Sequence, residues 1–338
     1  MPALRALPRK LRRMPRYPLI GDVLAATARL SGIALRTPLE ASLPLAVESG
    51  AAEVRLKLEN AQPTGAFKTR GAHNKIALVA AEGGEKKLVT ASSGNHGIAV
   101  ATAAGRYGMS ATILVGASVS PAKLERLRGL ETDSITVEVF GRDSDEAEAE
   151  ARRRDDAGQA VYVSPYNDAD VIAGQATVGV EILDEWPECE AIVVPVGGGG
   201  LISGIGLWVK GLKPGIRLVG VQPAASPPMY AHLESGATGP MPIAPTLADG
   251  VAGNIERGSI TWKMCRQLVD EMAIVDEEQI ADAMRWAIDV PHLLLEGSGV
   301  LGIAALRGDQ LSSVRGLRVA VVVTGRNLGV DALRQVLG

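Results

Sequence analysis

The stretch Ala191-Ile192-Val193-Val194-Pro195-Val196-Gly197-Gly198-Gly199-Gly200-Leu201 decides the fold class. Six apolar residues predict a buried strand, four glycines predict a tight loop, and the run from Leu201 predicts a helix. A membrane span is the alternative, because Ala191–Val209 is nineteen residues without a charge. Pro195 and the glycines within it favour a strand, a loop and a helix, so we expect no membrane-spanning segment.

Strand and helix patterns alternate along the rest of the chain, which predicts right-handed β-α-β units and an α/β fold with parallel-rich sheets. The other expected strands are Val54–Leu58, Leu88–Ala91, Ala111–Val115, Ile135–Val139, Leu218–Val221 and Leu317–Val323. The expected helices cover 66–81, 96–107, 121–130, 144–157, 168–185, 200–211, 276–289 and 296–307. Such sheets bind ligands at the carboxyl ends of their strands, so the loops there are the candidate sites.

The second informative segment is Thr64-Gly65-Ala66-Phe67-Lys68-Thr69-Arg70-Gly71-Ala72, which follows the strand Val54–Leu58 and opens a helix. A lysine in the first turn of a helix is usually solvated, and the helix dipole mildly disfavours its charge. The alternative is that Lys68, flanked by small residues at the end of a strand, is held in a cleft.

The third segment, Ala91-Ser92-Ser93-Gly94-Asn95-His96-Gly97, also lies between a strand and a helix. Its small residues leave backbone N–H groups free to point at an anion, assisted by the amino end of the helix. An ordinary N-capping turn is the alternative, but capping needs only one Ser or Asn. His96 taken alone is more often a hydrogen-bonded structural histidine than a catalyst.

The glycine loop Gly197, Gly198, Gly199 and Gly200 can wrap a phosphate with several backbone N–H donors. Its spacing does not fit the dinucleotide pattern G-x-G-x-x-G, and Gln222 at the end of the next strand supplies no acid for a ribose. No lysine follows the glycines as in a P-loop. The loop therefore predicts a cofactor that carries a phosphate but is not a nucleotide.

In this order, the three segments resemble the serine/threonine dehydratase branch of the fold type II pyridoxal-phosphate enzymes, which also contains serine racemases. The resemblance runs from about Ile20 to the carboxyl end. Further matching motifs are Arg36-Thr37-Pro38-Leu39, Val171-Ile172-Ala173-Gly174-Gln175, Thr246-Leu247-Ala248-Asp249-Gly250 and Leu295-Glu296-Gly297-Ser298-Gly299. The resemblance implies a two-domain fold of the tryptophan synthase β type, with pyridoxal 5'-phosphate in the cleft between the domains.

The resemblance also assigns the cofactor site. Lys68 would carry pyridoxal phosphate as a Schiff base and later move the α-proton of the substrate. Phe67 would flank the cofactor ring, Asn95 would hydrogen-bond the ring hydroxyl, and Gly197 to Gly200 would cradle the phosphate. Thr324, in Val323-Thr324-Gly325-Arg326-Asn327, matches the hydroxyl residue that faces the pyridine nitrogen.

The same resemblance places the substrate carboxylate at the loop formed by Ser92, Ser93, Asn95 and His96. Ser93 would face Lys68 across the substrate and handle protons on the other side, which is the arrangement of serine racemases. Dehydratases can carry serine there too, so racemisation stays open beside dehydration.

The hydroxyl at Thr324 has a chemical consequence. A neutral hydroxyl does not hold a pyridine nitrogen protonated as a carboxylate would, so the ring is a weaker electron sink. This favours β-elimination, in which the electrons leave promptly with a hydroxyl group. We therefore expect a lyase that converts a hydroxy amino acid such as L-threonine or L-serine to a 2-oxo acid and ammonia.

Other activities remain as alternatives. Arg326 replaces the small residue usual beside the pyridine-facing hydroxyl, and it is either a surface arginine or a contact for a second carboxylate, as in threo-3-hydroxyaspartate. The region from Pro227 to Trp262 and Leu293–Gly299 also looks like dehydratases associated with hydroxyectoine breakdown. A non-catalytic amino-acid-binding protein that retains the fold is the rival from another class.

Metal dependence is not expected. Many relatives bind a divalent cation through acidic side chains after the strand equivalent to Leu218–Val221. Here Gly220–Pro228 contains no carboxylate, and its prolines remove donors and flexibility.

The domain prediction also follows from the resemblance. Residues 1–79 and 161–338 would form the large cofactor-binding domain, and residues 80–160 a small mobile domain whose closure excludes water. We expect a homodimer on the same basis.

Composition limits partners and location. The chain of 338 residues has a formal charge of −3, which gives no general attraction for nucleic acid or an acidic membrane surface. Cys189 and Cys265 show no CxxC spacing, which is typical of a reducing cytoplasm. The amino-terminal tail is basic but lacks an apolar core, so we expect a solvated tail, with a transit peptide or partner-binding arm as alternatives. Its basic residues are Arg5, Arg9, Lys10, Arg12, Arg13 and Arg16.

Overall fold

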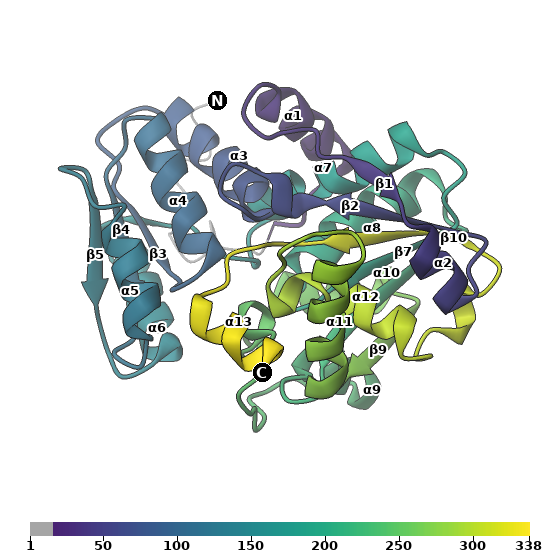
Figure 1. The fold of residues 1–338 in the computed structure, drawn as a ribbon. Helices are drawn as coiled ribbons and strands as arrows, with labels where there is room; N and C mark the ends of the chain where they lie inside the picture. Colours follow the sequence, from purple (N-terminus) through teal and green to yellow (C-terminus); the bar gives the residue numbers. More distant parts are fainter. Residues whose placement is uncertain (1–15) are drawn as a thin grey trace.

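The structure is a computed structural model, and it describes residues 16–338. Two β-sheets form its framework, with helices on both faces of each (Figure 1). The α/β class and the parallel-rich sheets predicted from the sequence are confirmed. Of the basic tail, only Arg16 lies within the described residues, where it pairs with Asp22 and Asp170.

The larger sheet has six strands in the order β1-β2-β10-β7-β8-β9. All neighbours are parallel except β1 and β2. The strands are β1 (Leu39–Ala41), β2 (Glu53–Leu58), β7 (Ala191–Pro195), β8 (Arg217–Pro223), β9 (Glu271–Val275) and β10 (Arg318–Val323). The last strand therefore lies between the second and the seventh, which joins the two ends of the chain in one sheet.

The smaller sheet has four parallel strands in the order β5-β4-β3-β6. They are β3 (Leu88–Ala91), β4 (Ala111–Val115), β5 (Ile135–Val139) and β6 (Val161–Tyr162). The sheet arises from the segment predicted to form the small domain, and β6 extends it two residues past the predicted limit of 160. The division into 1–79, 80–160 and 161–338 stays a prediction.

Helices cover both sheets. They are α1 (Ile20–Leu30), α2 (Leu43–Ser49), α3 (Lys68–Ala81), α4 (Asn95–Arg106), α5 (Pro121–Arg128), α6 (Ser144–Asp156), α7 (Ala169–Glu185), α8 (Gly200–Leu212), α9 (Pro228–Ser235), α10 (Ile260–Leu268), α11 (Glu277–Asp289), α12 (Leu301–Arg307) and α13 (Val330–Leu337). Short 3₁₀ turns are η3 (Glu59–Ala61), η4 (Asp249–Val251), η5 (Gly297–Gly299) and η6 (Ser312–Val314).

Each sheet is buried on both faces. In β10, Val319, Val321 and Val323 pack toward α2, α11 and α12, whereas Ala320 and Val322 pack toward α7, α8 and α10. Alternate residues of a strand point to opposite faces, so a doubly covered strand must be apolar throughout. Residues of α3, α4 and α5 pack on one face of the smaller sheet, and residues of α6 pack on the other.

Most expected elements form within a few residues of their predicted bounds, with one informative error. The helix expected over 296–307 is wrong in its first turns, because Glu296 has extended backbone angles and a 3₁₀ turn precedes α12. The strands β1 and β6 were not predicted, since three and two residues are too short to show a period of two. The longer β9 and the helices α1, α2, α9, α10 and α13 were also missed.

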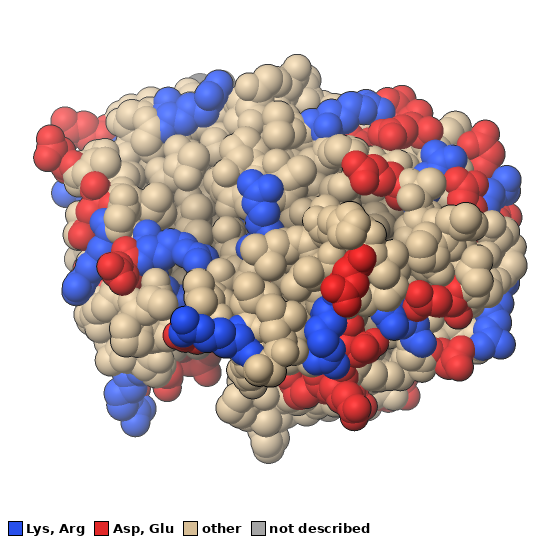
Figure 2. Space-filling view, viewed as in Figure 1, with Lys and Arg blue, Asp and Glu red and all other residues tan. Residues whose placement is uncertain are grey.

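Positive and negative side chains are interspersed over the face shown in Figure 2, with no patch of a single sign.

Within residues 16–338, no helix combines the length and the apolar character needed to cross a membrane.

Candidate active site

The sheet order brings three predicted site segments together. Because β2, β10 and β7 are parallel neighbours, the loops that follow their carboxyl ends lie side by side. The loop after β2 leads to Lys68, the loop after β10 begins with Thr324, and the loop after β7 is the glycine loop. These residues are far apart in the sequence, and strand order alone makes them neighbours.

Lys68 is the first residue of α3 and is half-buried. Its Nζ donates a hydrogen bond to the carbonyl oxygen of Pro165 at 2.7 Å and lies 5.1 Å from the centre of the Phe67 ring. Burial lowers the pKa of the Lys68 amine to about 8. A substantial fraction of this amine is therefore neutral near pH 8, as a nucleophile or a base requires.

Thr324 is held beside Phe67 by the backbone. The Phe67 amide donates to the Thr324 carbonyl at 3.1 Å, and Ala66 and Gly325 form an antiparallel bridge. The Thr324 hydroxyl is buried and donates to the Ser298 carbonyl at 3.3 Å. No carboxylate of the described residues hydrogen-bonds this hydroxyl. Its predicted role toward a pyridine nitrogen stays a prediction.

The glycine loop presents unused donors. The backbone N–H groups of Gly197, Gly198, Gly199 and Gly200 have no acceptor within residues 16–338. Gly199 has φ +84°, and a Cβ at Gly198 would lie 2.3 Å from Cγ of Tyr166. Four free donors at the start of the helix α8, in a position that excludes larger side chains, fit a phosphate.

The segment from Val163 to Asn167 is a part of the site that sequence reasoning missed. Pro165 accepts the bond from Lys68, and Val163 accepts a bond from His96. The Tyr166 ring packs against Gly198, and its Cα and Cβ lie against Gly200. The segment follows the two-residue strand β6 and therefore carries no periodic signal. Its only sequence signal is its place between a strand and the helix α7.

Asn95 lies in a hydrogen-bond network that crosses between the sheets. Its Nδ2 donates to Oε1 of Glu296 at 2.7 Å, and its Oδ1 accepts from Nδ2 of Asn327 at 2.7 Å. Nδ2 of Asn327 also donates to the Thr64 carbonyl at 2.8 Å, and the backbone N–H of Asn327 donates to Oε2 of Glu296 at 3.0 Å. One Nδ2 hydrogen of Asn95 remains for another acceptor.

Glu296 is the second site residue that sequence reasoning left without a role, although its motif had been recognised. Burial raises its pKa to about 7, despite the hydrogen bond from Asn95 that favours the charged form. A carboxyl group that titrates near neutral pH beside a candidate cofactor site is a candidate functional group. Its signal in the sequence is an acid that follows an apolar run and precedes Gly297-Ser298-Gly299.

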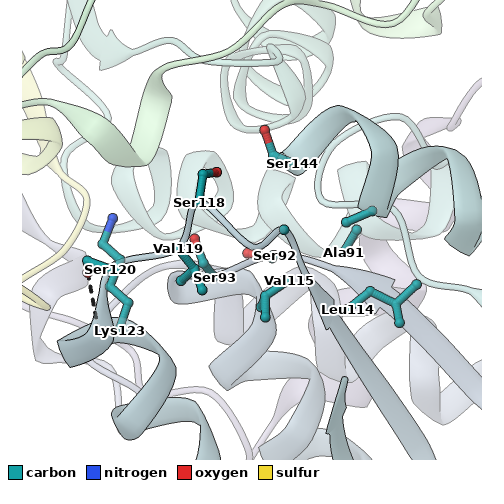
Figure 3. A pocket seen from close by; sticks show the side chains of 12 residues that line it. Ala91, Ser92, Ser93, Leu114, Val115, Ser118, Val119, Ser120, Lys123 and Ser144 are labelled. Carbon is teal, nitrogen blue, oxygen red and sulfur yellow. Dashed lines mark hydrogen bonds between the residues drawn. The ribbon is translucent and has the colours of Figure 1, made fainter. Parts of the chain in front are cut away.

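Ser92 and Ser93 lie on the wall of a cavity of about 310 Å³ at the carboxyl ends of β3 and β4 (Figure 3). The Ser93 hydroxyl has no hydrogen-bond partner among the described residues, whereas the Ser92 hydroxyl accepts from the Gly94 amide at 3.3 Å. Lys123 also lines this cavity and pairs with Asp249. This ion pair connects α5 of the smaller sheet with η4.

His96 faces the interior. Its ring is buried, and its Nε2 lies 2.9 Å from the carbonyl oxygen of Val163. Burial, followed by the charge of Lys68, lowers its pKa to about 3, so the imidazole is neutral. The bond from Nε2 can support the loop that begins α4, whereas Nδ1 is buried without a hydrogen-bond partner among the described residues. Its predicted role toward the substrate stays a prediction.

Arg326 is exposed, and its side chain has no hydrogen bond or ion pair within the part of the chain described.

Residues 16–338 contain no group of three or more His, Cys, Asp or Glu side chains placed to hold a metal ion.

Taken together, these side chains fit pyridoxal phosphate. The free N–H groups of Gly197 to Gly200 suit its phosphate, the desolvated amine of Lys68 suits its aldehyde, and Asn95 and Thr324 supply polar groups for its ring.

Comparison with known proteins supports this assignment. Residues 30–325 match the family described as pyridoxal-phosphate dependent enzyme. The L-threonine ammonia-lyase of Thermotoga maritima is 39% identical over 94% of this chain and 77% of its own length. A serine racemase of Oryza sativa subsp. indica is 32% identical over 93% of this chain and 92% of its own length.

Solved structures give the same result. Maize serine racemase superposes with a TM-score of 0.86 at 31% identity, covering 95% of this chain and 97% of its own. The processed form of threonine deaminase isoform 2 from Solanum lycopersicum superposes with a TM-score of 0.85 at 29% identity, covering 96% and 90%. The predicted resemblance and the two-domain fold class are confirmed.

Proposed function

Because this chain belongs to the family of pyridoxal-phosphate dependent enzymes, we propose that it converts a hydroxy amino acid to a 2-oxo acid and ammonia by β-elimination. L-Threonine and L-serine are the proposed substrates. The observation that carries the proposal is that the partly neutral, desolvated amine of Lys68, the buried hydroxyl of Thr324 and the free N–H groups of the glycine loop follow the carboxyl ends of three neighbouring parallel strands.

The proposed roles of the side chains follow from their contacts. When bound, pyridoxal phosphate supplies an electron sink for the negative charge that develops at Cα of the substrate. The Lys68 amine holds the cofactor, and once freed it accepts the α-proton at Nζ, for which a pKa near 8 is suitable. The amino end of α4, with Ser92 and Ser93, orients the substrate carboxylate.

Water exclusion is the remaining requirement. Helices α4, α5 and α6, which cover the small sheet, contact the rest of the chain through Asn95 to Glu296, Lys123 to Asp249 and Arg152 to Glu256. We propose that these contacts hold residues 80–160 against the larger part during the reaction. Reactive groups are then kept from bulk water.

The direct test is the release of 2-oxo acid from L-threonine, L-serine and threo-3-hydroxyaspartate. Lys68→Ala should abolish both turnover and the visible absorbance of the bound cofactor. Lys87→Ala is the control, because this exposed lysine has no side-chain partner among the described residues. An unchanged spectrum in Lys68→Ala would refute the assignment, and no turnover of any hydroxy amino acid would favour a non-catalytic amino-acid-binding protein.

Serine racemisation is a second candidate function. It is supported by the unpartnered hydroxyl of Ser93 on the cavity wall and by the likeness to serine racemases. Chiral analysis of serine recovered from the reaction tests it. D-Serine formed by the natural chain and lost in Ser93→Ala would establish racemisation, and serine recovered only as the L form would exclude it.

We also propose that the chain is a cytoplasmic homodimer. The family likeness supports the dimer, and two buried free cysteines, Cys189 and Cys265, support a reducing compartment. Light scattering coupled to gel filtration measures the oligomeric state.

A further inference from the structure

Four charged side chains form a buried network behind the first turn of α3. Lys57 is on β2, Glu59 is in η3, Arg70 is on α3 and Glu181 is on α7. The side chains of Lys57, Glu59 and Arg70 are at most 1% exposed, and that of Glu181 is 13% exposed. Two positive and two negative groups are thus collected in the interior, next to the cofactor lysine in the sequence.

Arg70 is the centre of the network. Its guanidinium donates to both carboxylate oxygens of Glu59, at 2.7 and 2.8 Å, and to both oxygens of Glu181, at 2.6 and 2.8 Å. Lys57 extends the network by donating to Glu181 at 2.6 Å. Paired bonds of this kind define the orientation of a planar guanidinium as well as its position.

Glu59 and Arg70 stay charged. Burial alone would raise the pKa of Glu59, yet the charge and hydrogen bonds of Arg70 lower it. Burial likewise acts against the charge of Arg70, but Glu59 and Glu181 raise its pKa. The hydroxyl of Thr37 adds a bond of 2.6 Å to Glu59.

Stability alone is a poor explanation of such a cluster. Taking charges out of water costs several kcal/mol per ion, and well-packed apolar side chains of the same volume often serve stability equally well. What a saturated cluster provides is a single geometry. Here that geometry involves both ends of the connection from β2 to α3, because Glu59 precedes the connection and Arg70 follows Lys68 by two residues.

We propose that Lys57, Glu59, Arg70 and Glu181 act as a positioning network that sets the place of the Lys68 amine in the site. They touch neither substrate nor cofactor, and they act through the first turn of α3. The inference rests on the proposed function only in taking Lys68 as the cofactor lysine.

A second anchor on the same helix provides a control. Lys75 lies two turns further along α3 and pairs with Asp168 at 2.8 Å and Asp170 at 3.0 Å, both at the start of α7. Lys75→Met therefore weakens the attachment of α3 to α7 without altering the cluster at its first turn. The test variant is Arg70→Lys, which keeps the charge and loses the paired bonds.

The first measurement is the pH dependence of Lys68 acylation in the full chain freed of cofactor, read by mass spectrometry. The natural chain and Lys75→Met should show a midpoint near 8. In Arg70→Lys the midpoint should move toward 10.5, the value of an exposed lysine, because the amine gains access to water. His96, whose pKa is lowered to about 3 by burial and then by the charge of Lys68, stays neutral across this range.

The second measurement is turnover of the holoenzyme. Arg70→Lys should lower kcat by about 100-fold with little change in KM, as expected for a displacement of about 1 Å at the reacting group. Thermal unfolding of both variants shows whether the two differ in stability. A normal Lys68 midpoint and a normal kcat in folded Arg70→Lys would overturn the proposal.

Glu181→Gln keeps the test decisive if Arg70→Lys does not fold, because it leaves the bonds between Arg70 and Glu59 intact. A smaller shift of the Lys68 midpoint in the same direction supports positioning, and no shift contradicts it. Acylation needs no turnover. A chain without dehydratase activity would therefore refute the proposed function while leaving this result interpretable.

Discussion

Nδ2 of Asn95 lies 2.7 Å from Oε1 of Glu296, and this bond joins the first residue of α4 to the segment that precedes η5. The two residues are 201 positions apart in the sequence. The contact therefore couples the loop proposed to bind the substrate carboxylate with a buried carboxyl group whose pKa is raised to about 7.

Glu296→Gln should change how stability depends on pH. The pKa of Glu296 is raised from 4.5 to about 7 in the folded chain, so its contribution is fully present below pH 4.5 and is lost as the pH rises through 7. Relative to Glu296→Gln, the natural chain should lose about 3 kcal/mol of unfolding free energy between pH 4.5 and pH 8. Urea unfolding of both proteins at these pH values measures the difference, and a pH-independent difference would contradict the raised pKa.

His96→Gln should show the opposite dependence. The pKa of His96 is lowered from 6.5 to about 3, so its contribution is present above pH 6.5 and is lost as the pH falls toward 3. Glutamine can still donate to the Val163 carbonyl but does not titrate. Between pH 6.5 and pH 3 the natural chain should lose up to roughly 5 kcal/mol more unfolding free energy than the variant. Equal acid sensitivity of the two proteins in urea unfolding would show that His96 is charged when folded.

Attachment of pyridoxal phosphate to Lys68 should depend on pH through the neutral amine. Below a pKa of about 8 the rate should fall about tenfold per pH unit, and above it the rate should level off. Stopped-flow absorbance after mixing cofactor with the cofactor-free chain measures the rate. Lys87→Ala is the control, and a rate that keeps rising to pH 10 would mean that Lys68 is exposed to water.

Gly198→Ala should weaken cofactor binding. The added Cβ would lie 2.3 to 2.6 Å from three carbon atoms of the Tyr166 ring, so the loop or the ring must move. Overpacking of this kind costs about 1–3 kcal/mol, which corresponds to about 5- to 150-fold weaker binding. Gly215→Ala is the matched control, because nothing lies within 4 Å of its Cβ position. Equal affinities in a fluorescence titration would show that the loop tolerates a side chain.

Local patterns were sufficient for the part of the site that lies in short motifs. Lys68, Asn95 and the four glycines each sit where a strand gives way to a helix, and such transitions are visible in the order of apolar, small and polar residues. The tertiary contacts of these residues could not be predicted from the sequence. Pro165, Tyr166 and Glu296 follow elements too short or too irregular to leave a periodic signal, so they were missed as parts of the site.

The sequence by itself determined the α/β class, the parallel sheets and the family, because these depend on periodicity and on motifs of a few consecutive residues. Tertiary structure decided the rest. Strand β10, the last in the chain, lies between β2 and β7, which places Thr324 beside Phe67. The segment after β6 brings Pro165 to Lys68 and Tyr166 to Gly198. The tertiary structure also buries Lys68, Glu296 and the network around Arg70 away from solvent. Their protonation depends on burial and on partners distant in the chain, and neither is encoded in any local stretch.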